Sequence, residues 1–245
     1  MKIKILDKVI VENFHESNSC LFYLYDEGKC VISDVLRKNT VWEKYLHNVF
    51  EQYITADSVV LEGGCHVGSH TMKLASLAGF VHAFEPLPSS YALLSKNILE
   101  NKFENVCLHK YALSDRITTS RYGWSADGNP GASGLDSNPM GLPGWCQKPV
   151  DEIVVETTTI DQLALKKLDF IKLDIEGYEP LAIKGGLKTI SRCLPIITME
   201  VWSDHLGSLD PNRPREVFPD LFNMGYRYGQ IGNSPDFIFI HESQL

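Results

Sequence analysis

The segment 61–70, LEGGCHVGSH, concentrates residues that can do chemistry: one carboxylate, one thiol, two histidines and three glycines. Two kinds of chemistry fit these residue types. The glycines would let the backbone approach a nucleotide closely, beside the free N–H groups of a helix start. Alternatively, His66 and His70 have the spacing of a metal-binding pair, with Glu62 and Cys65 beside them. The elements around the segment distinguish the two.

The spacing of the glycines favours the nucleotide-binding interpretation. A buried strand ending at Glu62 is expected to lead through Gly64 and Gly68 into a helix. A dinucleotide fingerprint requires Gly-x-Gly-x-x-Gly, whereas three residues separate Gly64 from Gly68 in this chain. That is the acid-x-Gly-x-x-x-Gly pattern of S-adenosylmethionine sites. A metal pair would need both histidines on one helix, and His66 precedes Gly68 in the turn.

Two later strand ends extend the predicted cofactor site. Glu85 ends the next expected strand, 23 positions after Glu62, where an acid in this topology binds both ribose hydroxyls, and Pro86 follows it. The third strand leads into YALSD, in which Ser114 and Asp115 are placed to close the adenine side. Ser114 fits equally well as a helix or turn cap, and a strand-end glutamate is also common as a solvated charge.

Acidic residues at two further strand ends are candidates for orienting or deprotonating a substrate. In a doubly wound sheet the ligand lies beyond the carboxyl ends of the strands. Asp174, in FIKLDIEGYE, is the first candidate. Glu200, in IITMEVWSDH, is the second, because a charge that ends an apolar run costs free energy unless it is paired or faces a site. His205 is a third, since histidine can act as a base near neutral pH.

Structural roles compete with these catalytic ones. Pro180 suits the first turn of a helix, where acids are stabilised by the helix dipole. Glu176 and Glu179 fit that role better than Asp174 does. His205 also fits an ordinary surface histidine. The acids together have the hard oxygen ligands that a divalent cation prefers, so a metal is possible, although none is expected.

Composition and charge exclude some classes of protein. The chain has 245 residues, of which 44% are hydrophobic, enough for a substantial core. The formal net charge is −8 without a long basic run, so a nucleic-acid partner is not expected and a small neutral or cationic ligand fits more easily. The N-terminus lacks the unbroken apolar stretch of a signal peptide, and no run has membrane-spanning length. We therefore expect a soluble, cytoplasmic protein with no membrane partner.

The cysteines do not form a recognisable framework. They lie at positions 20, 30, 65, 107, 146 and 193. These spacings contain no Cys-x-x-Cys pair, and the chain is not a small disulfide-dense one. We expect reduced thiols and no structural zinc.

Residues 1–54 are expected to form a segment that packs on a main domain at 55–245. Residues 1–35 contain short apolar runs, IKIL, KVIV, LFYLY and CVIS, which predict a small antiparallel sheet. TVWEKYLHNVFEQYI has helical spacing, and Thr40 with Glu43 has the spacing of a capping box.

The main domain alternates strand, turn and helix. SVVLE, FVHAFE and NVCLHKYAL predict buried strands, separated by helices in GSHTMKLASLA and SSYALLSKNILENK. LDFIKLDI and LPIITMEVW predict two more strands around a helix in PLAIKGGLKTIS, and YRYGQI with DFIFIH predicts a closing strand pair. The pattern therefore predicts a doubly wound α/β fold, a parallel sheet with helices on both faces closed by an antiparallel pair.

Residues 121–150 interrupt this alternation. They are rich in glycine and proline, have no helical or strand period, and contain Trp124 and Trp145. Long loops inside a compact domain are usually functional lids or linkers. The tryptophans favour a substrate lid, in which they would suit stacking on a sugar ring; alternatively they pack against the core.

Five blocks of the chain, in order, resemble the signature blocks of the FkbM-type S-adenosylmethionine-dependent methyltransferases. They are VVLEGGCHVGSHTMKLASLAGFVHAFEP, NVCLHKYALSD, TTTIDQL, LDFIKLDIEGYEPLAIKGG and PIITMEV, and the resemblance spans about residues 42–201. GNPGASGL resembles a smaller block of some members. The resemblance implies a class I methyltransferase fold, usually acting on hydroxyl groups of sugars, polyketides or related metabolites.

The resemblance also implies roles for individual residues. The methionine part of the cofactor would contact Gly64 and Gly68, the ribose Glu85, and the adenine Ala112, Ser114 and Asp115, with Pro86 and Asp174 completing the set. Two positions depart from the family pattern: Glu62 stands where Asp is commoner, and His66 where Asn is commoner. A longer carboxylate and a ring in the first turn would shift the methionine end of the pocket.

We therefore expect an S-adenosylmethionine-dependent O-methyltransferase whose acceptor is a small molecule or carbohydrate. A nucleotide-sugar or NAD-dependent oxidoreductase would need the pyrophosphate glycine spacing, which the first turn lacks. A metal hydrolase built on His66, His70 and Glu62 is disfavoured by the turn between the histidines. The unusual Glu62 and His66 keep a non-catalytic cofactor-binding protein with the same fold as an alternative. The sequence does not identify the acceptor.

Overall fold

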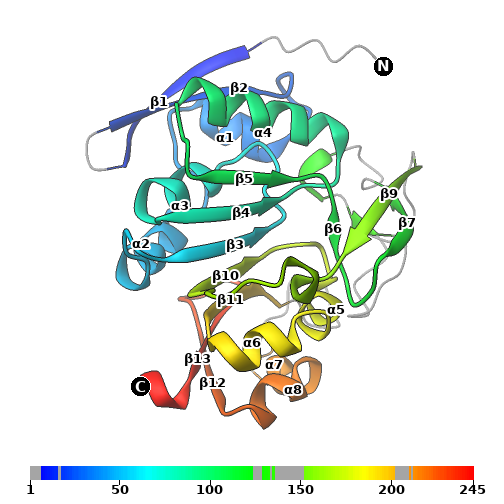
Figure 1. Cartoon of the computed structure of the whole chain (residues 1–245). Helices are drawn as coiled ribbons and strands as arrows, with labels where there is room; N and C mark the ends of the chain where they lie inside the picture. Colours follow the sequence, from blue (N-terminus) through cyan, green and yellow to red (C-terminus); the bar gives the residue numbers. More distant parts are fainter. Residues whose placement is uncertain are drawn as a thin grey trace.

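The centre of the molecule is a seven-stranded sheet in the order β12-β13-β11-β10-β3-β4-β5 (Figure 1). The computed structural model describes residues 7–15, 18–123, 129–132, 134–135, 152–201, 210 and 212–245. The strands β3, β4, β5, β10 and β11 are parallel, β13 runs antiparallel to β11, and β12 antiparallel to β13. The predicted doubly wound sheet with a closing antiparallel pair is confirmed. The strands are β3 Val59–Gly63, β4 Phe80–Phe84, β5 Val106–His109, β10 Phe170–Leu173, β11 Ile196–Glu200, β12 Tyr226–Gln230 and β13 Asp236–His241.

Helices cover both faces of this sheet. Val60 and Val81 share one hydrophobic cluster with the N-terminal segment and the helices α2, α3 and α4. Leu61 and Ile171 face the other way, into a cluster with α5, α6 and α8. This alternation is the reason that the strands are apolar on both sides. The helices are α1 Val31–Arg37, α2 Lys44–Tyr53, α3 Thr71–Leu77, α4 Pro88–Glu100, α5 Glu179–Lys184, α6 Leu187–Cys193, α7 Arg213–Val217 and α8 Pro219–Asn223.

The helix expected in PLAIKGGLKTIS is two helices, α5 and α6. Gly185 ends α5, and a Cβ on Gly185 would lie 2.1 Å from the carbonyl oxygen of Ser114. Gly185 therefore lets the backbone of a neighbouring loop pass close to the helix end, where the helix is interrupted.

The N-terminal segment begins with the expected hairpin, β1 Asp7–His15 and β2 Asn18–Leu24. Two local expectations are wrong. CVIS forms the start of α1 instead of a strand, because the Sγ of Cys30 accepts a hydrogen bond from the N–H of Ser33 and caps the helix. The capping box is not formed either, since α2 begins after Glu43, whose backbone is left-handed with φ 44° and whose side chain does not cap the helix.

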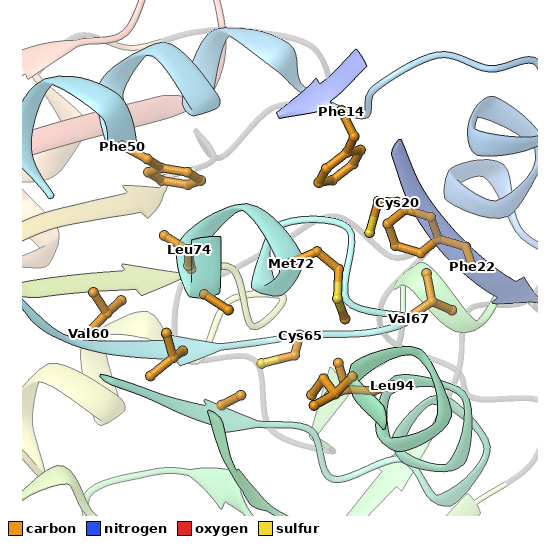
Figure 2. Packing of buried hydrophobic residues seen from close by; sticks show 14 of the residues in the cluster. Phe14, Cys20, Phe22, Phe50, Val60, Cys65, Val67, Met72, Leu74 and Leu94 are labelled. Atoms are coloured by element: carbon orange, nitrogen blue, oxygen red, sulfur yellow. The ribbon is translucent and has the colours of Figure 1, made fainter. Parts of the chain in front are cut away.

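The N-terminal segment packs directly on the sheet. Figure 2 shows Phe14 and Phe22 of the hairpin and Phe50 of α2 in one buried cluster with Val60 of β3 and Leu74 of α3. At their relative exposures of 5% or less, these side chains form the core on this face of the sheet.

A second, four-stranded sheet with the order β6-β9-β7-β8 lies beside the main one (Figure 1). Its strands are β6 Ala112–Leu113, β7 Thr118–Gly123, β8 Gly134–Leu135 and β9 Glu152–Thr158. The single strand expected in NVCLHKYAL is thus divided between two sheets, as β5 and β6. Sequence patterns did not predict β7, because most of its side chains are exposed or polar and leave no alternation.

In the described part of the chain, no helix combines the length and the apolar character that crossing a membrane requires.

Candidate functional site

A cavity lies at the carboxyl ends of β3, β4 and β10. Including its open mouth, the space between its walls is about 610 Å³. The residues predicted from the sequence that line this cavity are Gly64, His66, Glu85, Pro86, Ala112 and Asp174. These side chains come from four separate segments, which only the fold brings together.

The first turn follows β3 through three residues with positive φ: Gly64 at 83°, His66 at 50° and Gly68 at 93°. A Cβ on Gly64 would lie 1.8 Å from the carbonyl oxygen of Asp174, so no side chain fits there. Histidine and asparagine are among the non-glycine residues that most readily adopt positive φ. The histidine at position 66, where the family commonly has asparagine, therefore meets the same backbone requirement. Gly68 does not line the cavity and instead faces Leu94 and α3.

His66 links the turn to the N-terminal segment. Its ring stacks on Tyr25 with centroids 5.6 Å apart, and its Nε2 lies 3.6 Å from the Sγ of Cys30. Burial lowers the pKa of His66 to about 4, so the ring is neutral at pH 7. Its Nδ1 is buried and finds no hydrogen-bond partner among the described residues.

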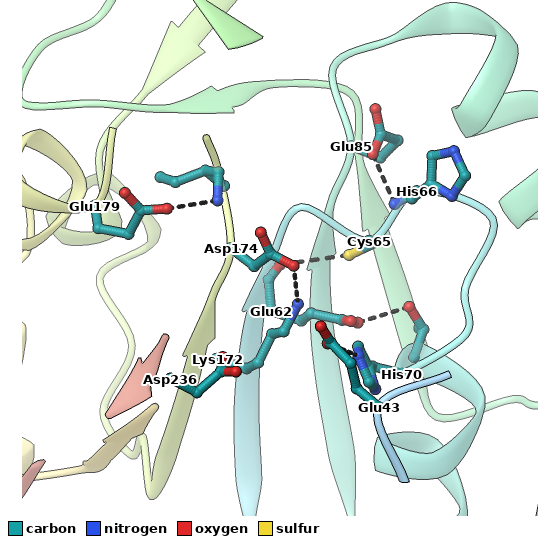
Figure 3. A network of polar contacts seen from close by, with 12 residues as sticks. Glu43, Glu62, Cys65, His66, His70, Glu85, Lys172, Asp174, Glu179 and Asp236 are labelled. Carbon is teal, nitrogen blue, oxygen red and sulfur yellow. Dashed lines mark hydrogen bonds and ion pairs between the residues drawn. The ribbon is translucent and has the colours of Figure 1, made fainter. Parts of the chain in front are cut away.

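Glu85 fixes the shape of the turn with its carboxylate. One oxygen accepts a hydrogen bond from the N–H of His66 at 2.7 Å (Figure 3). The other accepts from the N–H of Leu87 at 2.8 Å. Burial raises the pKa of Glu85 to about 7, against the lowering effect of these two bonds. Each oxygen has a second lone pair, so Glu85 can still accept hydrogen bonds from a ligand.

Glu62 lies behind the cavity wall and does not line it. It is fully buried, and its Oε2 accepts a hydrogen bond from the Oγ1 of Thr71 at 2.6 Å. Its Oε1 has no hydrogen-bond partner in the described part of the chain. Burial raises the pKa of Glu62, and nearby Lys172 opposes that rise. Glu62 therefore supports the turn from inside the sheet.

A buried lysine lies among acids at the same edge of the sheet (Figure 3). The Nζ of Lys172, on β10, lies 3.1 Å from the Oδ2 of Asp174. Burial lowers the pKa of Lys172, but Asp174, Glu62 and Glu43 outweigh it and raise the pKa above its ordinary value. Glu43 comes from the N-terminal segment, and its Oε2 lies 3.0 Å from the Nε2 of His70. Burial, with Asp174, raises the pKa of Glu43 to about 7.

Glu200 ends β11 opposite Asp236 of β13 and does not line the cavity. Burial raises the pKa of Glu200 well above its ordinary value, and the neighbouring Asp174 and Glu176 raise it further. Asp236 accepts a hydrogen bond from the hydroxyl of Tyr45 at 2.6 Å. Glu200 therefore lies close enough to Asp174 and Glu176 to interact with their charges, but it is not part of the cavity wall.

Two further predicted residues, Ser114 and Asp115, lie away from the cavity. Ser114 donates its backbone N–H to Thr158 within the second sheet, and Asp115 pairs with Arg116 at 2.9 Å. Neither lines the cavity; both follow β6, whose two residues, Ala112 and Leu113, pair with β9 in the second sheet. His205, Trp124 and Trp145 lie outside the described residues.

Several lining residues were not predicted from the sequence. Glu176 was interpreted as a helix cap, but its backbone is left-handed with φ 55° and it lines the cavity. Non-glycine residues with this φ cluster at functional sites, and the neighbouring glycine in IEGYE was the available signal. Glu179 does have the structural role expected, since it accepts a hydrogen bond from the N–H of Ile175 at 2.7 Å. The other unpredicted lining residues include Ile32, Tyr111, Tyr122, Pro130, Leu135 and Tyr178.

Comparison with known proteins identifies the family. Residues 63–228 match the family model described as the Methyltransferase FkbM domain. The chain is 25% identical over 181 residues to the 2-O-methyltransferase NoeI of Sinorhizobium fredii (strain NBRC 101917 / NGR234), covering 66% of this chain and 71% of that protein.

The structure is similar to the crystal structure of Methyltransferase FkbM from Methylobacillus flagellatus KT. The TM-score is 0.51 at 14% identity, over 80% of this chain and 50% of that chain, so the present chain spans half the length of that one. This likeness confirms the class I methyltransferase fold. Since the family model also covers more than half of the sequence, the chain belongs to the FkbM methyltransferase family.

Proposed function

We propose that this methyltransferase transfers the methyl group of S-adenosylmethionine to a hydroxyl group of a sugar, glycan or small metabolite. The observation that carries the proposal is the cavity at the strand ends. Its wall contains the glycine turn at Gly64 and His66, which Glu85 holds by a hydrogen bond to the N–H of His66. The relative from S. fredii bears the name of a 2-O-methyltransferase, which supports oxygen as the acceptor atom. The net charge of −8 supports a small acceptor over a nucleic acid.

The residues present fit the proposed cofactor. Gly64 keeps the wall at the turn free of a side chain, so that a ligand can approach the backbone. Glu85 offers acceptors for the ribose hydroxyl groups, and the buried Nδ1 of His66 is a further polar atom that a ligand can satisfy. Carboxylates outnumber the one buried lysine, Lys172, at this edge, which favours a cationic ligand.

We assign the ribose to Glu85 and the methionine part to Gly64 and His66. Ala112 is the member of the predicted adenine group that lines the cavity. Contact of the adenine with Ser114 or Asp115 stays a prediction, as does a direct contact of the cofactor with Glu62 or Gly68.

Bound S-adenosylmethionine supplies an electrophilic methyl group on a sulfonium. The chain has to hold the acceptor oxygen in line with that methyl group, exclude water and accept the hydroxyl proton. Alignment contributes about 7–11 kcal/mol, whereas a general base contributes about 10²- to 10⁴-fold. Asp174 lines the cavity and is the first candidate for both orienting the acceptor and accepting its proton. Glu200, behind it, is the second, and His205 stays a prediction.

The lid proposed at 121–150 is supported by its described part. Tyr122, Pro130 and Leu135 come from this region and line the cavity. Their position supports a lid role, in which the region would exclude water from the transfer.

Replacing Glu85 with alanine should abolish cofactor binding. The variant loses the ribose acceptor and both bonds that hold the turn, and each bond to a charged group contributes about 1.5–3 kcal/mol. We expect the affinity for S-adenosylmethionine and for S-adenosylhomocysteine, measured by calorimetric titration, to fall by about 100-fold or more. If the unaltered chain shows no binding at millimolar cofactor, the proposed function is wrong.

The same titration should depend on pH through Glu85. Because burial raises the pKa of Glu85 to about 7, the ionised acceptor is lost as pH falls. At pH 6 about a tenth of the free carboxyl is ionised, so the affinity should be about tenfold lower than at pH 8. Burial also raises the pKa of Glu179 to about 7, but Glu179 does not line the cavity. Glu179→Gln should therefore keep the pH dependence, and a flat profile in the unaltered chain would contradict the role of Glu85.

Asp174→Asn should lower turnover while cofactor binding persists. We expect a decrease in kcat of about tenfold or more for Asp174→Asn and a smaller one for Glu200→Gln, with the affinity for S-adenosylmethionine within about threefold. Labelled S-adenosylmethionine with a panel of monosaccharides and short oligosaccharides provides the assay, and mass spectrometry locates the methyl group. Glu216→Gln, on the exposed face of α7, is the control. Full activity of both variants would mean that the base lies elsewhere or that alignment suffices.

A further inference from the structure

A cluster of two histidines and one cysteine lies on the strands at the β5 end of the main sheet. His82 is on β4, and Cys107 and His109 are on β5, the last strand in the order of the sheet. In the parallel register, His82 is the partner of Cys107, and His109 is the partner of Phe84. Partners in a sheet, and residues two apart on a strand, point to the same face. All three side chains therefore project from one face, and each is half-buried.

The three ligand atoms are close enough to share one ion. The Nδ1 of His82 lies 3.1 Å from the Nε2 of His109, and one nitrogen of each ring and the Sγ of Cys107 all lie within 4.8 Å of one another. With zinc–nitrogen bonds of about 2.0–2.1 Å, two tetrahedral ligands are about 3.3 Å apart. In the described part of the chain, no other group of three or more histidine, cysteine, aspartate or glutamate side chains has its ligand atoms this close together. The two ring nitrogens therefore already have the separation of two zinc ligands, and the Sγ of Cys107 lies near enough to join them after a small side-chain movement.

The surroundings hold the two imidazoles in place. The ring of Phe80 meets that of His82 edge-on with centroids 5.0 Å apart, and the ring of Phe84 stacks on that of His109 at 4.3 Å. Burial lowers the pKa of both histidines, that of His109 to about 4 with a contribution from His82. Neutral rings are the form that binds metals. The backbone is part of a sheet, so the ligands are held on a rigid element.

We propose that His82, Cys107 and His109 form a binding site for a divalent zinc-type metal ion that joins β4 to β5. One nitrogen from each histidine and the thiolate give three ligands of the types that zinc prefers, and water completes the tetrahedron from the exposed side. On binding, the thiol loses its proton to solvent, so about one proton is released per metal. The proposed site differs from the expectation of no structural zinc. The sequence did not indicate the site, because its ligands are separated in the chain and meet only through the register of two strands.

Titration of the full-length, reduced chain with zinc chloride, and with cobalt chloride as a spectroscopic probe, tests the site. We expect one zinc ion per chain by calorimetry and, with cobalt, a thiolate-to-metal charge-transfer band. Cys107→Ser should remove the band and weaken zinc binding by about 100-fold, and His109→Asn by about tenfold or more. Cys193→Ser is the matched control, since Cys193 is also a half-buried free cysteine but belongs to no such cluster in the described chain. Absence of binding, or equal binding by Cys107→Ser, would overturn the proposal.

Two readouts separate metal binding from failure to fold. Zinc should raise the melting temperature of the unaltered chain and of Cys193→Ser by several degrees, and leave that of Cys107→Ser unchanged. In the unaltered chain, zinc should slow alkylation of Cys107 by iodoacetamide without slowing that of Cys193, as located by peptide mapping. Equal protection of both cysteines would contradict the site. None of these measurements depends on methyl transfer, so they are independent of the proposed function.

Discussion

Replacing Gly64 with alanine should unfold the first turn and abolish cofactor binding together. The new Cβ would lie 1.8 Å from the carbonyl oxygen of Asp174, which is backbone and cannot rotate away. The left-handed φ of 83° adds about 1–2 kcal/mol of strain, and overpacking typically costs about 1–3 kcal/mol. We expect the free energy of unfolding, measured in urea, to fall by about 2–5 kcal/mol. The end of β10 would also be pushed away from β3, so the cavity would lose its shape.

Two neighbouring glycines separate the contributions of strain and clash. Gly68 also has a positive φ, 93°, but a Cβ there would meet the ends of the flexible Leu94 and Met72 side chains at 2.8 and 2.9 Å. Gly63 has no positive φ, and a Cβ there would meet side-chain atoms alone: the ends of two leucines, each at 2.9 Å, and Ile175 at 3.3 Å. The loss of stability should therefore decrease in the order Gly64→Ala, Gly68→Ala, Gly63→Ala. An equal loss at all three would show that the contact with the Asp174 carbonyl is not what requires glycine at 64.

Lys172→Met should destabilise the fold by about 3–5 kcal/mol, the typical result of removing one partner from a buried ion pair. Lys172 is 2% exposed and is the common neighbour of Asp174, Glu62 and Glu43. Methionine has a similar volume, so the loss comes from acids left without a counter-charge rather than from a cavity. Urea unfolding provides the measurement.

The loss of stability in Lys172→Met should depend on pH, and the pKa of the neighbouring acids determines the direction of that dependence. Burial already raises the folded-state pKa of Glu62 above its ordinary value, and loss of the lysine should raise it further. A raised folded pKa means that stability falls as pH rises from the ordinary pKa towards the folded one. The destabilisation by Lys172→Met should therefore be larger at pH 8 than at pH 5.

A second substitution provides the control for this pair. Adding Glu62→Gln to Lys172→Met removes one of the unpaired acids and should recover part of the stability at pH 8. Lys172→Arg keeps the charge and should lose less than Lys172→Met. If the double variant is as unstable as the sum of the two single ones, Glu62 and Lys172 do not interact.

Much of the fold follows from local patterns in the sequence. Short apolar runs predicted the strands of the main sheet, because strands buried on both faces are apolar throughout. Helical periods predicted α2, α3 and α4, because each of these helices buries one face. The strands β6, β7 and β8 of the second sheet were not recognised as separate elements, for the opposite reason. Most side chains of β7 are exposed or polar, and β6 and β8 have two residues each, too short for a period to appear.

Some residues of the candidate site were also predictable from the sequence, and others were not. Gly64, His66 and Glu85 were predicted, since strand ends and glycine spacing place them within about 20 positions of one another. Glu176 was assigned to a helix cap, because its left-handed backbone and its place on the cavity wall are not visible in the sequence. Ser114 and Asp115 were predicted to contact the adenine, but they follow β6, which already belongs to the second sheet, and they do not line the cavity.

The sequence by itself determined the alternation of strands and helices along the main sheet, the glycine turn after β3 and the acid at the end of β4. These features depend on residues close together in the chain, whose spacing and polarity are sufficient to identify them. Only the tertiary structure decided that Glu43 and Lys172 meet Asp174 at one edge, and that His82 faces Cys107 and His109. Contacts of this kind depend on strand order and register, which join residues far apart in the chain and leave no periodic trace in it.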